Sequence, residues 1–361
     1  MYSRIRRFYQ VKSIVKSAVY KAVSPWHSGR GSILMFHRVC QEQDKSAIKF
    51  NSVLEVTAQY LERIILYFLK NDYRFAAIDE VPEVLVSNSK GAQKIVVFTF
   101  DDGYADNHLL AYPLLKKYEV PFAIYITTSF PEHTAVLWWY MLDDLVSKND
   151  RICFGYEGQR FELDCSTPHL KEGVFLKIRQ LIISCGEGKL SSLLQAVFEE
   201  YGIRPDLKIR EMALSWEQIA ELAQDPLVTI GAHTLNHVAL SKLGVKELMH
   251  EIVESRRLIE SKIKKPVRHF SYPFGGKNEA GPREFNAVRQ CGFETGTTSR
   301  TGNLFSGHRF HLEALPRLLV DGNIEDARDL EVFVSGFMPF VHNRLRRLVF
   351  DSPSIVGKIK Y

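Results

Sequence analysis

Two adjacent carboxylates, Asp101 and Asp102, directly follow the apolar segment IVVFTF at residues 95–100. Like charges at the tip of a buried strand repel each other, so at least one should titrate abnormally unless a cation neutralises the pair. Two histidines, His233 and His237 in the segment GAHTLNH, are candidates for binding such a cation. Imidazole is the commonest metal ligand, and a four-residue spacing on a helical turn would point both rings the same way.

Two imidazoles and one carboxylate form a ligand set typical of hydrolytic zinc sites, which leave one coordination position for water. One aspartate would then neutralise the ion, while its neighbour takes a proton from water whose pKa the metal lowers toward about 7. The HxxxH spacing alone is a weak signal in a chain with twelve histidines. Its position after the apolar segment LVTIGA, at 227–232, strengthens it.

Short apolar segments alternate with amphipathic ones along the chain. The expected strands are 32–39, 95–100, 121–127, 227–233 and 267–273. The expected helices are 54–72, 107–118, 215–224, which Ser215 and Gln218 start as a capping box, and 245–263. This alternation predicts a parallel sheet with crossover connections, either closed as a barrel or open. In both cases the chemistry lies at the carboxyl ends of the strands, where both motifs fall.

Several motifs resemble those of a known family. TFDDGY (99–104), HTLNH (233–237) and FSYPFG (270–275), in this order, resemble motifs of the polysaccharide deacetylase family, the NodB-homology domain of carbohydrate esterase family four. LMFHRV (34–39) and ALPR (314–317) resemble flanking motifs of its bacterial exopolysaccharide and biofilm-polysaccharide branch. The resemblance implies an α/β fold, namely a distorted, incomplete (β/α) barrel of the seven-stranded type, and metal-dependent removal of acetyl groups from sugars.

The resemblance also implies a role for each motif residue. Asp101 would be the general base, and Asp102 would bind the metal with His233 and His237. Thr234 would hydrogen-bond within its loop and hold the His237 ligand. Zinc is the expected metal, and manganese, cobalt and iron are alternatives because such a ligand set accepts them too.

Other residues are expected to stabilise the oxyanion or bind the substrate. The backbone N–H of Phe274, in the turn YPFGG, would join the metal in stabilising the oxyanion, and Tyr272 would lie beside it. Trp138, Trp139 and Tyr140 offer flat faces that could stack on a sugar ring, with Trp138 as the first candidate. An alternative is that these aromatic residues only anchor an insertion to the core.

The chain departs from the family pattern in its third motif. Many members have an arginine two residues before the proline of this motif, where it pairs with the base, but here the position is Ser271. Arg317 in ALPR is our candidate for that role, with Arg268 second. The general acid that protonates the leaving amine is expected at His311, with His308 as the alternative.

Four further polar residues have competing interpretations. His37 either lines the floor of the pocket or is a hydrogen-bonded core histidine. Asp143 and Asp144 repeat the double-aspartate pattern, but they lie in a helical pattern and are expected on a solvated helix face. Asp106 is expected to cap the helix that begins near residue 107.

We expect three regions: a basic N-terminal arm at 1–30, a deacetylase domain at 31–325 and a basic C-terminal tail at 326–361. Residues 140–212 interrupt the strand–helix alternation and are expected to form an insertion of short helices and polar loops over one face. The predicted function is a metal-dependent hydrolase that removes acetyl groups, N-acetyl first, from a sugar or polysaccharide precursor. The alternatives are a deformylase or other amide hydrolase with the same site, and a non-catalytic carbohydrate-binding relative.

The composition and charge of the chain limit its expected location and binding partners. The 361 residues are 45% hydrophobic and 25% charged, which is typical of a globular protein. No apolar segment is long enough to span a membrane, no secretory signal is recognised, and five scattered cysteines fit a reducing compartment, so a cytoplasmic location is expected. Residues 1–40 contain eight Lys or Arg and no acidic residue, so the arm could contact an anionic membrane near a lipid-linked substrate. The acidic remainder argues against nucleic acid.

Overall fold

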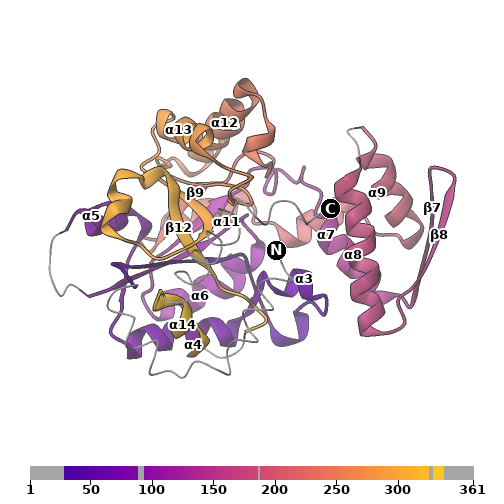
Figure 1. Cartoon of the computed structure of the whole chain (residues 1–361), viewed down its shortest axis with the longest axis horizontal. Helices are drawn as coiled ribbons and strands as arrows, with labels where there is room; N and C mark the ends of the chain where they lie inside the picture. The colour runs from indigo at the N-terminus through magenta and orange to yellow at the C-terminus, as the bar shows by residue number, and fades with distance from the viewer. Residues whose placement is uncertain (1–27, 88–92, 186–187, 325–327, 337–361) are drawn as a thin grey trace, which may run out of the picture.

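Seven parallel strands close into a barrel in the computed structural model, which describes residues 28–87, 93–185, 188–324 and 328–336 (Figure 1). Their order around the barrel is β1 (Gly31–Phe36), β12 (Leu315–Leu319), β11 (Thr295–Thr301), β10 (His269–Ser271), β9 (Val228–Ala232), β6 (Phe122–Ile126) and β5 (Ile95–Phe100). β1 pairs with both β12 and β5, and this double pairing closes the ring. The short strand β4 (Arg74–Phe75) adds to the start of β5. The predicted seven-stranded (β/α) barrel is confirmed.

Helices cover the outside of the barrel. They are α4 (Ala58–Lys70), α6 (Tyr112–Lys117), α11 (Trp216–Leu222), α12 (Val245–Ile263), α13 (Pro282–Gln290) and α14 (Arg328–Val334). Helix α5 (Val81–Val86) packs in a separate cluster with Ile95 and Val97, and the short helix α3 (Lys49–Ser52) lies next to the insertion. The predicted bounds of α12 and the capping box of α11 are confirmed. α4 begins later than expected because Thr57 caps it, accepting a hydrogen bond from the Tyr60 N–H. No helix within the described ranges is long and apolar enough to cross a membrane.

One strand prediction needed correction, and two strands were not predicted. The expected strand 32–39 is two strands, because β2 (Arg38–Cys40) leaves the barrel and pairs with β3 (Glu55–Thr57). β11 and β12 were not expected, since β11 reads TGTTSRT and β12 contains a proline and an arginine. The polar side chains of the first half of β11 and of Arg317 are nevertheless buried, because the barrel supplies hydrogen-bond partners that an isolated strand lacks.

The insertion is more ordered than expected. It contains α7 (Trp138–Lys148), a hairpin of β7 (Arg151–Tyr156) and β8 (Gln159–Asp164), α8 (Pro168–Ser184), α9 (Leu190–Phe198) and α10 (Pro205–Met212). The expectation of short helices and polar loops was wrong for α8, which has 17 residues and buries Phe175 and Ile178. The insertion stands beside the barrel (Figure 1) and has a hydrophobic cluster of its own.

Candidate metal centre and active site

Strand alternation aims Asp101 into the barrel. Along β5, Val96 and Phe98 belong to the cluster under the outer helices, whereas Ile95 and Val97 belong to a second cluster on the opposite face. Because successive side chains of a strand alternate in direction, residues 95, 97, 99 and 101 share the inner face. Asp101 is therefore buried at the mouth of the barrel, 3% exposed.

Arg317 reaches the same place from β12. Its Nη1 and Nη2 each donate to one oxygen of Asp101 at 2.7 Å, a bidentate pair. The remaining donors go to Thr99 Oγ1 (3.1 Å), Ser271 Oγ (2.9 Å) and the Thr298 carbonyl (3.1 Å). All five guanidinium N–H groups thus have an acceptor. Ser271, at the family's arginine position, accepts a hydrogen bond from the arginine that β12 supplies instead.

This ion pair decides the charge of Asp101. Burial by itself would raise the pKa of the carboxyl, but the Arg317 guanidinium outweighs burial, so the pKa lies below its usual value. Asp101 is therefore ionised at neutral pH, with its carboxylate orientation fixed by two parallel hydrogen bonds. Arg268, the second sequence candidate, lies elsewhere: its side chain is half-exposed and faces Glu294 at 3.6 Å.

Asp102, His233 and His237 converge beside this pair. Asp102 Oδ1 lies 3.5 Å from Nε2 of His233 and 3.2 Å from Nε2 of His237, and one ligand atom from each residue lies within 4.8 Å of the others. Ligands at the bond lengths of a tetrahedral zinc site are about 3.3 Å apart. Asp102 Oδ1 is buried and accepts no hydrogen bond within the described residues. These observations fit a divalent metal ion.

Tight loops, rather than a helical turn, bring the two imidazoles together, so the expected helical geometry of HTLNH was wrong. Thr234 and His237 have positive φ angles of 66° and 54°, and Asp102 has 77°. Non-glycine residues adopt this region at a cost, which sites tolerate where side-chain direction matters. Thr234 Oγ1 accepts a hydrogen bond from the His237 N–H at 3.0 Å and so fixes the loop. Thr127 donates to the backbone carbonyl of His233 at 3.0 Å.

The protonation state of His233 suits a ligand. Its Nδ1–H donates to the Ser271 carbonyl at 2.7 Å, which leaves the Nε2 lone pair facing Asp102. Burial lowers the pKa of His233 to about 4, so the ring is neutral at pH 7. For His237 burial acts in the same direction, but the Asp102 carboxylate outweighs it and raises the pKa.

These residues form one end of a cavity of about 1650 Å³. Phe274, Tyr272 and Trp138, the predicted substrate residues, line it. Phe274 has a φ of 60° and is 60% exposed, its ring lies against His237, and its N–H makes no hydrogen bond within the described residues. Tyr272 is buried and donates to the Glu313 carbonyl at 2.8 Å. Trp139 also lines the cavity, whereas Tyr140 is buried outside it.

The structure does not bring the predicted general acid to the cavity. His311 is 70% exposed at its side chain and lies 3.9 Å from Glu313, and neither it nor His308 lines the cavity. His308 Nδ1 accepts a hydrogen bond from the Phe305 N–H instead. The cavity histidine that sequence reasoning left undecided is His37. Its buried Nδ1 has no partner within the described residues, and burial lowers its pKa.

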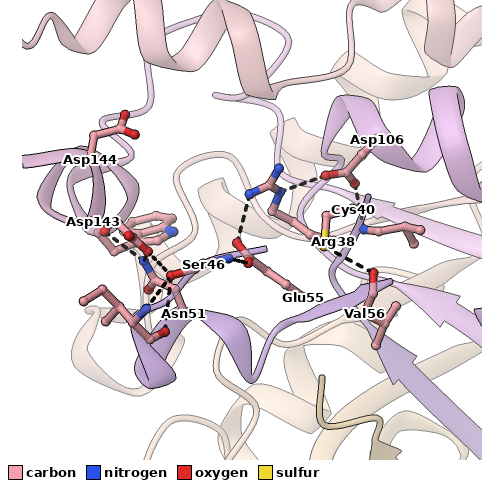
Figure 2. A network of polar contacts seen from close by, with 12 residues as sticks. Arg38, Cys40, Ser46, Asn51, Glu55, Val56, Asp106, Asp143 and Asp144 are labelled. Atoms are coloured by element: carbon pink, nitrogen blue, oxygen red, sulfur yellow. Dashed lines mark hydrogen bonds and ion pairs between the residues drawn. The ribbon is translucent and has the colours of Figure 1, made fainter. Parts of the chain in front are cut away.

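Asp106 binds the two residues that follow His37 in the chain and makes no capping hydrogen bond, so its assignment as a helix cap was wrong. Figure 2 shows its contact with Arg38. Its carboxylate accepts from Arg38 Nε at 2.8 Å and from the Val39 N–H at 3.1 Å. Arg38 also donates to Glu55 at 2.9 Å and packs over the Tyr140 ring, 4.9 Å from its centroid. Leaving the Arg38 guanidinium without a carboxylate would cost more free energy than leaving the helix without a cap, so the Asp106 carboxylate pairs with Arg38.

Asp143 is not on a solvated helix face as expected, because it is buried among donors from three segments (Figure 2). Its carboxylate accepts from the Ser46 hydroxyl, from Asn51 Nδ2 at 2.7 Å and from Ser147 Oγ at 3.0 Å. Asp144 points away from this network and pairs with Lys208 at 2.7 Å. The interpretation of the second aspartate pair was therefore wrong for its first member.

Comparisons with known proteins agree with this fold. A model of the family described as polysaccharide deacetylase matches residues 88–296, more than half of the chain. The putative polysaccharide deacetylase YxkH of Bacillus subtilis is 23% identical over 270 residues, which cover 75% of this chain and 64% of that protein. The chain thus spans less than two thirds of the length of this relative.

Two solved structures have similar folds. The Streptococcus pyogenes deacetylase PplD in complex with acetate aligns with a TM-score of 0.55 and 17% identity, covering 84% of this chain and 97% of that one. IcaB from Ammonifex degensii aligns with a TM-score of 0.52 and 18% identity, covering 85% and 98%. At these identities the likeness shows the fold, while the family model identifies the family. The chain belongs to the polysaccharide deacetylase family, whose members are hydrolases that act on carbon–nitrogen bonds other than peptide bonds.

Proposed function

We propose that residues 31–325, with residues 140–212 as an insertion, form a metal-dependent deacetylase that removes acetyl groups, N-acetyl first, from a sugar or polysaccharide. The observation that carries this proposal is the meeting, in one cavity, of the Asp102–His233–His237 cluster and the Arg317-held Asp101. We assign zinc to the cluster, with manganese, cobalt and iron as alternatives. When bound, the ion would polarise the acyl carbonyl and lower the pKa of the attacking water.

The chain's own residues then have separate tasks. Asp101 accepts the proton of the attacking water, because its carboxylate is ionised and Arg317 holds it in one orientation. The free N–H of Phe274 donates to the oxyanion. The Tyr272 hydroxyl donates to the Glu313 carbonyl and so holds one side of the cavity in place. The flat face of Trp138 stacks on the sugar ring.

We assign the proton donor for the leaving nitrogen to His37 in place of His311, because His37 lines the cavity. Burial lowers the pKa of His37, so its ring must first receive the proton that Asp101 takes from the attacking water before it passes that proton to the nitrogen. His37→Gln should reduce acetate release from an N-acetyl sugar by about 100-fold. The same change should matter far less for an aryl acetate ester, whose leaving group departs without a proton. His311→Gln is the matched control and should leave both rates unchanged. Equal losses on both substrates for His37→Gln would contradict this role.

The decisive experiment combines metal analysis with product release. Protein purified without added metal should contain a near-stoichiometric divalent ion, and His233→Ala should lose both the ion and acetate release. His250→Ala, an exposed position on α12, is the control. Formate in place of acetate would favour the deformylase alternative, and a metal-free wild type would refute the proposal. The expected membrane contact falls on the basic arm, whose residues 1–27 lie outside the described residues, and it stays a prediction, as does the cytoplasmic location.

A further inference from the structure

The cavity extends from the metal centre to the insertion, and its two ends differ in chemistry. At the barrel end it is lined by the ionisable residues of the candidate active site. The other end, which we call the insertion arm, is lined by Phe50, Leu190, Leu194, Phe198 and Ile203. The whole cavity measures about 1650 Å³, more than the roughly 300–1000 Å³ of an ordinary small-molecule site. A single acetylated sugar therefore leaves the insertion arm unfilled.

Helix α9 gives the insertion arm an apolar floor and a polar rim. Residues four apart share one face of a helix, so its apolar and polar residues form two stripes. The apolar stripe consists of Leu190, Leu194 and Phe198, of which the last two are buried. The polar stripe consists of Ser191, Gln195 and Glu199, which are exposed at the edge of the cavity. A chain of sugars needs hydrogen-bonding groups along its path, whereas the apolar stripe of α9 presents only hydrocarbon side chains.

Among the described residues that line the cavity, Arg179 is a cation without a carboxylate partner. Of the three arginines that line it, Arg317 pairs with Asp101, and Arg204 pairs with Asp206 at 2.7 Å. Arg179, on α8, forms no ion pair within the described residues. Its guanidinium lies 4.3 Å from the centroid of the Phe50 ring, and its buried Nε has no hydrogen-bond partner in the part of the chain that the structure describes.

We propose that the insertion arm binds the apolar chain of an amphiphilic substrate whose phosphate group pairs with Arg179. The sugar end of the same molecule would lie at the metal centre, so the substrate class is an acetylated amino sugar joined through phosphate to a long isoprenoid or alkyl chain. The apolar floor matches the chain, and the unpaired guanidinium matches the phosphate, because buried arginine is stable when an oxyanion accepts its hydrogen bonds. This inference rests on the proposed deacetylase function.

A ligand without an acetyl group tests the insertion arm separately from the chemistry. Isothermal titration of the full chain with farnesyl phosphate should give a dissociation constant at least about 100-fold below that of inorganic phosphate, because the chain buries apolar surface. Dodecyl phosphate in parallel distinguishes an isoprenoid from a plain alkyl preference. Arg179→Gln should weaken farnesyl phosphate binding by about tenfold and farnesol binding by much less.

The matched control is Lys177→Gln, an exposed position on the same helix, which should bind farnesyl phosphate like the wild type. Leu190→Ser, a change at the exposed end of the apolar stripe, should weaken farnesyl phosphate and farnesol alike. Equal binding of farnesyl phosphate and inorganic phosphate, or wild-type affinity in Arg179→Gln, would overturn the proposal.

Inhibition of acetate release tests whether farnesyl phosphate binds in the same cavity as the sugar substrate. Farnesyl phosphate should inhibit acetate release from a short N-acetylated sugar, and an N-acetyl sugar joined to farnesyl phosphate should be turned over at a KM at least about tenfold lower. Lack of inhibition by farnesyl phosphate would overturn the insertion-arm proposal and leave the deacetylase intact. Tight binding of farnesyl phosphate without acetate release from any sugar would instead refute the deacetylase and keep the amphiphile site.

Discussion

The chain contains two double-aspartate pairs, and the fold treats them differently. Asp101 and Asp102 end a barrel strand and face cationic or metal-binding groups, an arginine and two imidazoles. Asp143 and Asp144 lie on α7, where the first faces neutral donors and the second faces lysines at the surface. The pKa directions follow: Arg317 keeps the pKa of Asp101 low, whereas burial raises that of Asp143.

The comparison teaches that burial alone does not make an aspartate functional. Asp101 and Asp143 are both buried, and at least one carboxylate oxygen of each accepts hydrogen bonds. What differs is the charge of the partner, because a guanidinium stabilises an ionised carboxylate far more than a hydroxyl or an amide does. An ionised carboxylate held in one orientation beside the candidate metal ligands is suited to the proposed role of base, whereas a buried carboxyl with neutral partners is not.

The largest expected effect separates the two members of the first pair. Asp101→Asn should lower acetate release by about 10³-fold and keep the bound metal, because its amide cannot accept the proton but does not alter the ligand set. Asp102→Asn should lose the metal as well. Metal analysis and acetate release on both variants check this, and equal metal loss in the two would mean that their roles are reversed.

The next effect is on stability. Arg317→Gln should lower the free energy of unfolding by about 3–5 kcal/mol, because it leaves Asp101 buried and unpaired. Adding Asp101→Asn should recover part of this loss, since the uncompensated charge is then removed. Urea denaturation measures both, with Arg268→Gln as the exposed control. A double variant less stable than Arg317→Gln would argue that the charge is not the cause.

Asp143→Asn should cost about 1–2 kcal/mol, less than loss of the Arg317 pair, because its partners are neutral. Burial raises the pKa of Asp143 above its unfolded value, so the protonated carboxyl contributes stability that is present at low pH. That contribution is lost as the pH rises through the native pKa. The advantage of the wild type over Asp143→Asn, measured by urea denaturation, should therefore shrink as the pH rises above about 4, the pKa of an aspartate in the unfolded chain. Growth of that advantage with pH would contradict this assignment.

Asp144→Asn should have the smallest effect, below about 1 kcal/mol, because its ion pairs with Lys148 and Lys208 lie near the surface. Its thermal midpoint should stay within a few degrees of the wild type, and acetate release should be unchanged. Raising the salt concentration should reduce the difference further. A loss as large as that of Asp143→Asn would mean that the second pair acts as a unit.

The sequence predicted those features that local chemistry marks. The alternating strand and helix patterns predicted a parallel sheet, and the family resemblance implied its closure as a barrel. Four site residues stood in motifs directly after strands. Prediction failed where a side chain depends on distant partners. Asp143 resembled a surface residue because its donors Ser46 and Asn51 lie almost a hundred positions away. Asp106 resembled a helix cap because its partner, Arg38 on β2, lies far from it in the sequence.

The sequence by itself thus determined the family, the barrel and the residue types that can hold a metal ion. Only the tertiary structure decided between Arg317, the first sequence candidate, and Arg268 as the partner of Asp101, and it placed His37 rather than His311 in the cavity. The physical reason is that closing the barrel brings β1, β5 and β12 together, although β12 lies more than 200 residues along the chain from both. The register between these distant strands decides which side chains share that interior.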